Sequence, residues 1–254
     1  KKFVMPLTLG APRGTKPEQL LVSATMDLSE ECVTMKCNTF SFDKKIDDAL
    51  KASQSKLRPI SDKYIATISA DNLLTVACGV KGTDFVELLR TNESLRTMLI
   101  GINTAIDIDK MLRGVDGDLI VSIPSFGDKL QMSLLADASD VSWQKDVDYW
   151  KKSCPAGTSI ESCGPDSYRL KGTDYDAWFG VKDGKQLYVA PTMESVSKIG
   201  TNASRQLPSV VANQVKGSRF VAVLSLSSAI RQNPELSVVS SFLPRLQTIV
   251  LKIE

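Results

Sequence analysis

Residues 119–135, LIVSIPSFGDKLQMSLL, carry the clearest secondary-structure signal in the chain. Two runs dominated by Leu, Ile and Val flank a turn around Phe126-Gly127-Asp128, which is typical of two antiparallel strands. A second hairpin is predicted from Tyr175 to Val189, because Asp183-Gly184 is a dipeptide preferred in type I′ turns. Hairpins of this kind indicate a fold with mainly antiparallel sheets.

Further strands lie on either side of these hairpins. Apolar residues alternate with mostly polar ones over 20–28, which predicts a half-buried strand. Residues 32–42 return alongside it, and a change of parity before Phe40 predicts a bulge. The run YIATIS at 64–69 is compact and rich in β-branched residues, so we expect another strand there.

Helices are predicted between the strands. Asp43 is placed to cap a helix over residues 43–57, and Thr83 to cap another one. A further helix follows over residues 95–102. The stretch from 143 to 152 has Trp143, Val147 and Trp150 at helical spacing, which favours core packing of both tryptophans over ligand stacking.

The second half of the chain echoes the first. KYIATIS at 63–69 resembles RFVAVLS at 219–225 position by position, and each run follows a hairpin and a helix. We therefore predict a mixed α+β fold, mainly antiparallel sheets with helices packed on them, built of two related β-β-α-β-α-β units or of one irregular domain. The predicted divisions are an irregular N-terminal segment over 1–19, a first unit over 20–140 and a second over 141–254, with one continuous domain as the alternative.

Composition excludes several classes of function. The 254 residues include 31 Lys or Arg, 29 Asp or Glu and no His, so histidine-based catalysis, metal ligation and pH switching cannot occur within this chain. The near-neutral charge gives no basic surface for nucleic acid. No apolar run approaches the roughly 18 residues of a membrane-spanning helix. The run GVKDGKQ at 180–186 lacks the spacing and context of a phosphate-binding loop, and no cofactor is expected.

Cysteine spacing predicts one disulfide. Cys154 and Cys163 bracket a segment with Gly and Pro near both ends, so the two sulfurs can meet, and two free thiols are the alternative. Cys32 and Cys37 stand five apart on a predicted strand and point to opposite faces, which disfavours a bond between them. Cys78 is expected to be a small buried apolar residue. This spacing does not match a zinc site.

The densest acidic cluster holds Asp107, Asp109, Asp116 and Asp118. Closely spaced aspartates bind calcium in some proteins, but the order of an EF-hand loop is absent here. The stretch from 115 to 118 is typical of a turn that leads into a strand. We therefore predict no metal ligand and no catalytic residue.

Two segments carry a family resemblance. Residues 108–119, IDKMLRGVDGDL, and 178–189, WFGVKDGKQLYV, resemble recurring blocks of an uncharacterised family of exported Bacteroidetes proteins, commonly lipoproteins, known as a domain of unknown function. The resemblance covers most of the chain from about Leu20. It implies a mixed α+β fold and a place in the periplasm or at the outer-membrane surface, and it transfers no active-site residue. No lipobox cysteine is present, so we expect any lipid anchor upstream of Lys1.

Two functions fit these observations. The first is a non-enzymatic cell-envelope binding or scaffolding protein whose partner is an envelope protein or a glycan; the missing histidine, nucleotide loop and metal spacing favour it. The alternative is an exported carbohydrate-active hydrolase that uses a pair of carboxylates, since such chemistry needs only Asp or Glu. A concave site with two carboxyl groups about 5–10 Å apart would favour the enzyme.

Overall fold

The computed structural model describes residues 10–29, 31–125, 131–173, 175–237 and 245–253. Its strands are β1 (Leu21–Leu28), β2 (Cys32–Phe40), β3 (Leu74–Lys81), β4 (Val115–Ser125), β5 (Gln131–Ala138), β6 (Ser159–Gly164), β7 (Ser167–Lys171), β8 (Asp176–Lys182), β9 (Gln186–Ala190), β10 (Phe220–Ser225) and β11 (Thr248–Ile253). Its α-helices are α1 (Lys44–Gln54), α2 (Gly82–Thr91), α3 (Glu93–Ile102), α4 (Ile108–Arg113), α5 (Val147–Ser153), α6 (Met193–Lys198), α7 (Ser209–Val215) and α8 (Leu226–Gln232). Short 3₁₀ turns are η1 (Pro17–Gln19), η2 (Ile65–Thr67), η3 (Ser142–Asp146) and η4 (Pro234–Leu236).

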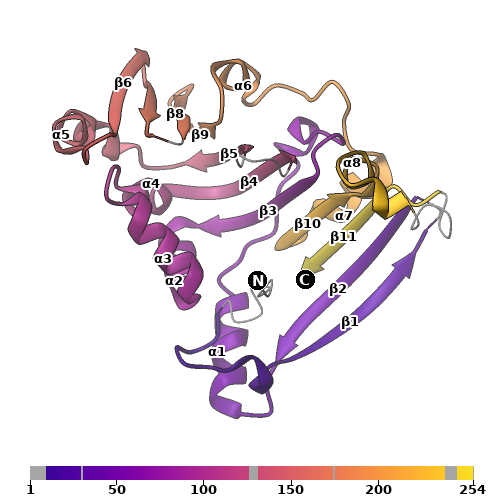
Figure 1. Cartoon of the computed structure of the whole chain (residues 1–254). Helices are drawn as coiled ribbons and strands as arrows, with labels where there is room; N and C mark the ends of the chain where they lie inside the picture. The colour runs from indigo at the N-terminus through magenta and orange to yellow at the C-terminus, as the bar shows by residue number, and fades with distance from the viewer. Residues whose placement is uncertain (1–9, 30, 126–130, 174, 238–244, 254) are drawn as a thin grey trace.

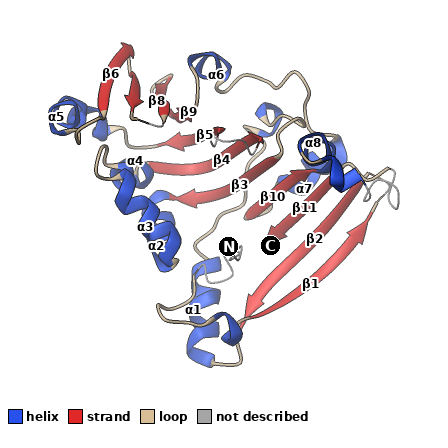
Figure 2. Ribbon diagram, viewed as in Figure 1, coloured by secondary structure: helices blue, strands red, loops and turns tan. Residues whose placement is uncertain are grey.

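All the strands of the described residues join one sheet, in the order β1-β2-β11-β10-β3-β4-β5-β9-β8-β7-β6 (Figures 1 and 2). Neighbouring strands pair antiparallel except β2 and β11, which run parallel. The predicted α+β fold with mainly antiparallel pairing is therefore confirmed. The sheet interleaves the two predicted units, because β10 and β11 of the second lie between β2 and β3 of the first.

Side chains alternate between the two faces of the sheet, and one face is packed over its centre. Ala77, Ile120, Val221 and Val250 are at most 4 % exposed there. They form one core with residues from the segment around η2 and from α7. We call this side of the sheet the packed face.

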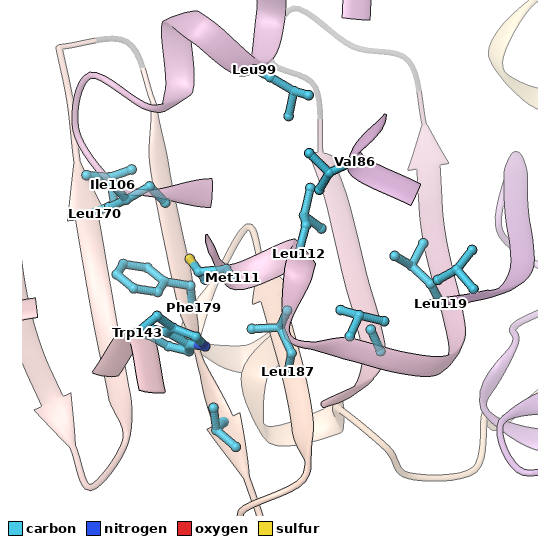
Figure 3. Close-up of a cluster of buried hydrophobic side chains, with 14 of the residues drawn as sticks. Val86, Leu99, Ile106, Met111, Leu112, Leu119, Trp143, Leu170, Phe179 and Leu187 are labelled. Carbon is cyan, nitrogen blue, oxygen red and sulfur yellow. The ribbon is translucent and has the colours of Figure 1, made fainter. Parts of the chain in front are cut away.

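Among the described residues, the cover of the opposite face is concentrated at one end of the sheet. Met111 of α4 and Trp143 of η3 meet Phe179 and Leu187 of the sheet in a second core, shown in Figure 3. The rings of Trp143 and Trp150 stack with centroids 6.0 Å apart and planes at 4°. Both tryptophans are buried, so the predicted core packing is confirmed.

The rest of that face is apolar and only partly buried. It belongs to β2, β11, β10 and the first residues of β3, whereas Cys78 and Val80 farther along β3 are buried in the second core with α2. Alternate residues of these strands point to it, and those with intermediate exposure are Met35, Cys37, Ile249, Leu251, Phe220, Ala222, Leu224, Leu74 and Val76. We call this surface the open face.

Residues 64–69 correct the sequence prediction. They form the 3₁₀ turn η2 and not a strand, and Tyr64 and Ile68 fill the packed-face core. The central strand is β3, which pairs with β10 on one side and β4 on the other. Two-sided pairing outweighs the β propensity of YIATIS. The two similar segments, 63–69 and 219–225, therefore form a turn and a strand, respectively, and do not occupy equivalent positions in the fold.

The order of elements still recurs along the chain. β1, β2, α1, β3, α2 and β4 are followed later by β8, β9, α7, β10, α8 and β11, with additional elements inserted. In both series the helix begins directly after the strand, at Gly82 after β3 and at Leu226 after β10. The two-unit interpretation itself stays a prediction.

Several local predictions are confirmed. Asp43 caps α1, accepting hydrogen bonds from the backbone N–H groups of Lys45 and Ile46. Asp183 and Gly184 have φ of 53° and 68°, as a type I′ turn requires. The hairpin of β4 and β5 forms, while its predicted turn at 126–128 lies outside the described residues.

Other local predictions are wrong. β1 and β2 pair in one continuous register without a bulge. β1 is exposed along nearly its whole length rather than half-buried, because it is the edge strand. Thr83 caps no helix: α2 starts one residue earlier, where a Cβ on Gly82 would lie 2.0 Å from the carbonyl oxygen of Leu112. This close approach leaves no room for a side chain at Gly82 or for a separate capping turn.

Within the described residues, no helix combines the length and the apolar character needed to cross a bilayer.

The same Val→Asp substitution should have different effects at a buried central position and at an exposed edge position of the sheet. Val221→Asp places a charge where no solvent reaches, and we expect it to lower the free energy of unfolding by more than about 3 kcal/mol. Val22→Asp on β1, where the side chain is 47 % exposed, should cost about 1 kcal/mol or less. Urea unfolding of both variants measures this. Equal losses would contradict the described packing.

Candidate binding site: an arginine-lined pocket

A hollow of about 200 Å³ lies beside α2, α3 and α4, and its lining includes Arg13, Arg90, Arg96 and Asp109. A second hollow of the same size adjoins it and shares the three arginines. We call the two together the arginine pocket. The helices that form it lie side by side in Figure 1.

A break between two helices positions Arg90 and Arg96. Asn92 ends α2 and caps α3, and its side chain accepts a hydrogen bond from the backbone N–H of Leu95 at 3.1 Å. The amide of Asn is well suited to this role, because it satisfies an N–H group that has no partner within the helix. Arg90 therefore lies in the last turn of α2 and Arg96 in the first turns of α3, on either side of the break.

Arg13 reaches the pocket from an irregular segment that the helices hold in place. The N–H of Gly10 donates to Thr91 Oγ1 at 2.8 Å, and Ser53 Oγ donates to the carbonyl oxygen of Gly10 at 3.1 Å. A Cβ on Gly10 would lie 2.6 Å from that of Ser53, so only glycine fits between the helices. The turn that carries Arg13 is thus fixed to both α1 and α2.

The three guanidinium groups differ in their partners. Arg90 forms an ion pair with Asp109, whose side chain is 11 % exposed. The other carboxylate oxygen of Asp109, Oδ1, is buried and accepts no hydrogen bond from a described residue. The guanidinium groups of Arg13 and Arg96 make neither a hydrogen bond nor an ion pair with the described part of the chain.

This arrangement suits an anionic group. Arginine presents several N–H donors in a planar fork that matches carboxylate and phosphate oxygens. The pocket holds three arginines against Asp109 and Glu93, which leaves one net positive charge. The first turn of α3 adds the positive end of a helix dipole at its rim. A cavity of this size admits one carboxylate, phosphate or sugar-sized group.

In the structure, the four aspartates of the predicted acidic cluster have separate roles. Asp107 caps α4, Asp116 pairs with Arg58, and Asp118 is buried beneath the loop before η2. Only Asp109 reaches the arginine pocket. Among the described residues, no group of three or more acidic or cysteine side chains is placed to hold a metal ion.

The backbone N–H of Asp118 donates a hydrogen bond to a second carboxylate, Asp137 Oδ2, at 3.4 Å. Ser61 donates to both oxygens of Asp118, from N–H at 3.0 Å and from Oγ at 2.5 Å. Asp137 Oδ1 accepts from Lys63 and, at 2.6 Å, from the hydroxyl of Tyr64. Burial, and then this carboxylate, raise the pKa of Tyr64 to about 12. These contacts join the loop to β4 and β5.

All five cysteines are free thiols in the structure. Cys154 follows α5 and Cys163 lies on β6, a strand that the sequence analysis missed. The predicted bond between them is not formed here, and peptide mapping of the non-reduced protein is its test. Cys32 and Cys37 point to opposite faces of β2, as predicted, because residues of odd separation alternate along a strand.

Cys78 provides a test of the core between α2 and the sheet. Burial, and secondarily the charge of Asp118, raise the pKa of this thiol to about 12, and the residue is 2 % exposed. We expect iodoacetamide to leave Cys78 unmodified in the native, reduced protein and to modify it in denaturant. Cys163, which is partly exposed, is the control. Equal labelling of both thiols in the native protein would contradict the described core.

Comparisons with known proteins add little. No protein-family model matches the chain, and no curated protein sequence matches it significantly. Crystal forms IV, III and I of TP0453 are similar at 11 %, 10 % and 12 % identity, with TM-scores of 0.42, 0.42 and 0.40. The match covers 68 %, 67 % and 63 % of this chain and 66 %, 64 % and 62 % of those chains. Such TM-scores are too low to assign a shared fold, so function rests on the site itself.

Proposed function

We propose that this protein is a non-enzymatic binding module of the cell envelope that takes an anionic group of a glycan or envelope protein into the arginine pocket. The observation that carries the proposal is the pair of Arg13 and Arg96, which line one hollow without partners in the described chain. Two unpaired guanidinium groups so close together repel each other, and an anion between them relieves that repulsion.

Arg90 and Asp109 give the pocket a fixed wall. Their ion pair holds the guanidinium of Arg90 at the boundary between the two hollows. Asp109 is largely buried, while the Arg90 side chain is 45 % exposed and therefore accessible to a ligand. The ligand therefore meets one positioned arginine and two that are free to close on it.

The family resemblance of residues 108–119 and 178–189 supports the cellular setting. It favours an exported protein of the periplasm or outer-membrane surface. An acidic glycan or an acidic protein segment is a partner available in that setting. The family membership and the location belong to this proposal.

A carboxylate-dependent hydrolase is the alternative, and it is considered for Asp118 and Asp137, which are linked through the backbone N–H of Asp118. Ser61, Lys63 and Tyr64 donate hydrogen bonds to them. A general acid or nucleophile needs a carboxyl oxygen that faces the substrate. These two side chains instead stabilise the loop before η2, which favours the binding function.

The binding proposal is tested with charge reversals. We expect Arg96→Glu and Arg13→Glu to weaken binding of an oligogalacturonate by at least about tenfold, because each removes a charge-assisted hydrogen bond and adds repulsion. Arg113→Glu is the matched control, since this exposed arginine on α4 lies outside the lining residues. Isothermal titration calorimetry measures all three. Equal effects of all three variants, or equal binding of neutral galactose oligomers, would overturn the proposal.

The same oligosaccharide separates binding from hydrolysis. We expect no release of shorter products during prolonged incubation with the wild-type protein. Reducing-end assays measure this, with Asp137→Asn as the comparison variant. Product formation by the wild type that Asp137→Asn abolishes would establish the hydrolase instead.

A further inference from the structure

The two edges of the sheet differ in how they are protected. β6, at one edge, has a register shift between Ser162 and Gly164, carries the charged Glu161 and contacts α5. β1, at the other edge, pairs with β2 over all eight residues without a shift. Figure 1 shows β1 as the outermost strand of the sheet. Bulges, charges and covering elements are the usual means of preventing association at an edge.

β1 has none of these means of protection within the described structure. Its sequence, LVSATMDL, contains no Lys, Arg, Pro or Gly, and Asp27 is its only charged residue. Val22, Met26 and Leu28 are 47 %, 58 % and 70 % exposed. These side chains share the side of the sheet on which the open face lies, because Met26 stands opposite Met35 of β2. The apolar surface of the open face thus extends across β1 to the edge of the sheet.

From this edge we infer that the protein forms a symmetric dimer in which β1 pairs antiparallel with β1 of a second copy. The inference is independent of the arginine pocket. An antiparallel pair related by a two-fold axis needs a strand that complements itself, and β1 does so about Thr25. Val22 then stands opposite Leu28 of the second copy and Ala24 opposite Met26, all on the open-face side.

Charge and polarity select this register. With the axis at Thr25, the hydroxyl of Ser23 faces the carboxylate of Asp27 from the second copy on the opposite side of the sheet. An axis at Ala24 would instead place Asp27 against Leu21, and an axis at Met26 would pair only five residues of the strand. Thr25 faces its own copy at the axis, and Thr–Thr pairs are favourable there.

The partner is a second copy because the pattern is self-complementary over the strand. A strand from another protein would need no symmetry about Thr25. The pairing joins the two open faces into one apolar surface across both copies, and the interface is isologous, the commonest kind in soluble oligomers.

Substitutions at the axis test this pairing. We expect the wild-type protein to sediment as a dimer at micromolar concentration. Thr25→Glu and Thr25→Lys each place two like charges directly opposite each other, and each should raise the dimer dissociation constant at least tenfold. An equimolar mixture of the two variants should recover the dimer as a heterodimer. Analytical ultracentrifugation measures all four samples.

Ser23→Lys is the matched control on the same strand. It adds a charge opposite Asp27 of the second copy, so the dimer should persist or tighten. Thermal melts confirm that each variant is folded, as expected because Thr25 and Ser23 are exposed. A monomeric wild type at sub-millimolar concentration would overturn the inference and leave the edge to a strand from another protein. A dimer unaffected by both Thr25 variants would also overturn it.

Discussion

The antiparallel pairing of β3 with β10 is the interaction on which the rest of this molecule depends. Five consecutive residue pairs, from Phe220–Cys78 to Leu224–Leu74, join segments that lie more than 140 positions apart in the chain. On one side of this pairing the sheet continues into β4, β5 and the aromatic core, and on the other into β11, β2 and β1. Without it, two smaller sheets would remain, each with an additional unpaired edge. Forming such distant pairs requires closing a long loop, which predicts slow folding.

Because β10 and β11 enter between β2 and β3, neither half of the sequence has a complete sheet of its own. The packed face shows this directly, since Ala77, Val221 and Val250 come from both halves and are fully buried together. The same interleaving explains why the described helices cover the opposite face mainly at one end. α2 and α4 follow β3 and pack over β4 and its neighbours, while α7 packs on the packed face against β11 and β2. The open face is what remains.

Sequence patterns predicted the elements that depend on neighbours close in the chain. The cap at Asp43 and the turn at Asp183-Gly184 are local, because the side chain or dihedral angle that specifies each lies within a few residues. The strand predicted at 64–69 failed because its β-branched residues serve a buried turn, whereas the weaker pattern at Leu74–Lys81 gains pairing on both sides. A high β propensity means that a segment suits a half-buried strand, but tertiary packing decides which segment forms that strand.

The arginine pocket could not be predicted from the sequence, for the same reason. Arg13 lies in a segment with no regular structure, and Arg90 and Arg96 flank a helix break that sequence reasoning did not locate at Asn92. No spacing rule links arginines that come from three different elements. Four acidic residues lie close together in the sequence, yet in the structure each has a separate partner. The usable signal was Asn92 itself, a residue that ends one helix and caps the next.

Polar and apolar groups of this molecule differ in whether they find their contacts within the chain. The carboxylates Asp118 and Asp137 accept hydrogen bonds within the chain, and the rings around Trp143 are buried against one another. Among the described residues, two surfaces of different chemistry stand out: the guanidinium groups of Arg13 and Arg96, and an apolar face that ends at the edge strand β1. Polar groups of the first kind select a ligand by charge, whereas backbone groups and apolar side chains of the second select a strand by register. Because these demands do not compete, one chain can meet both at once.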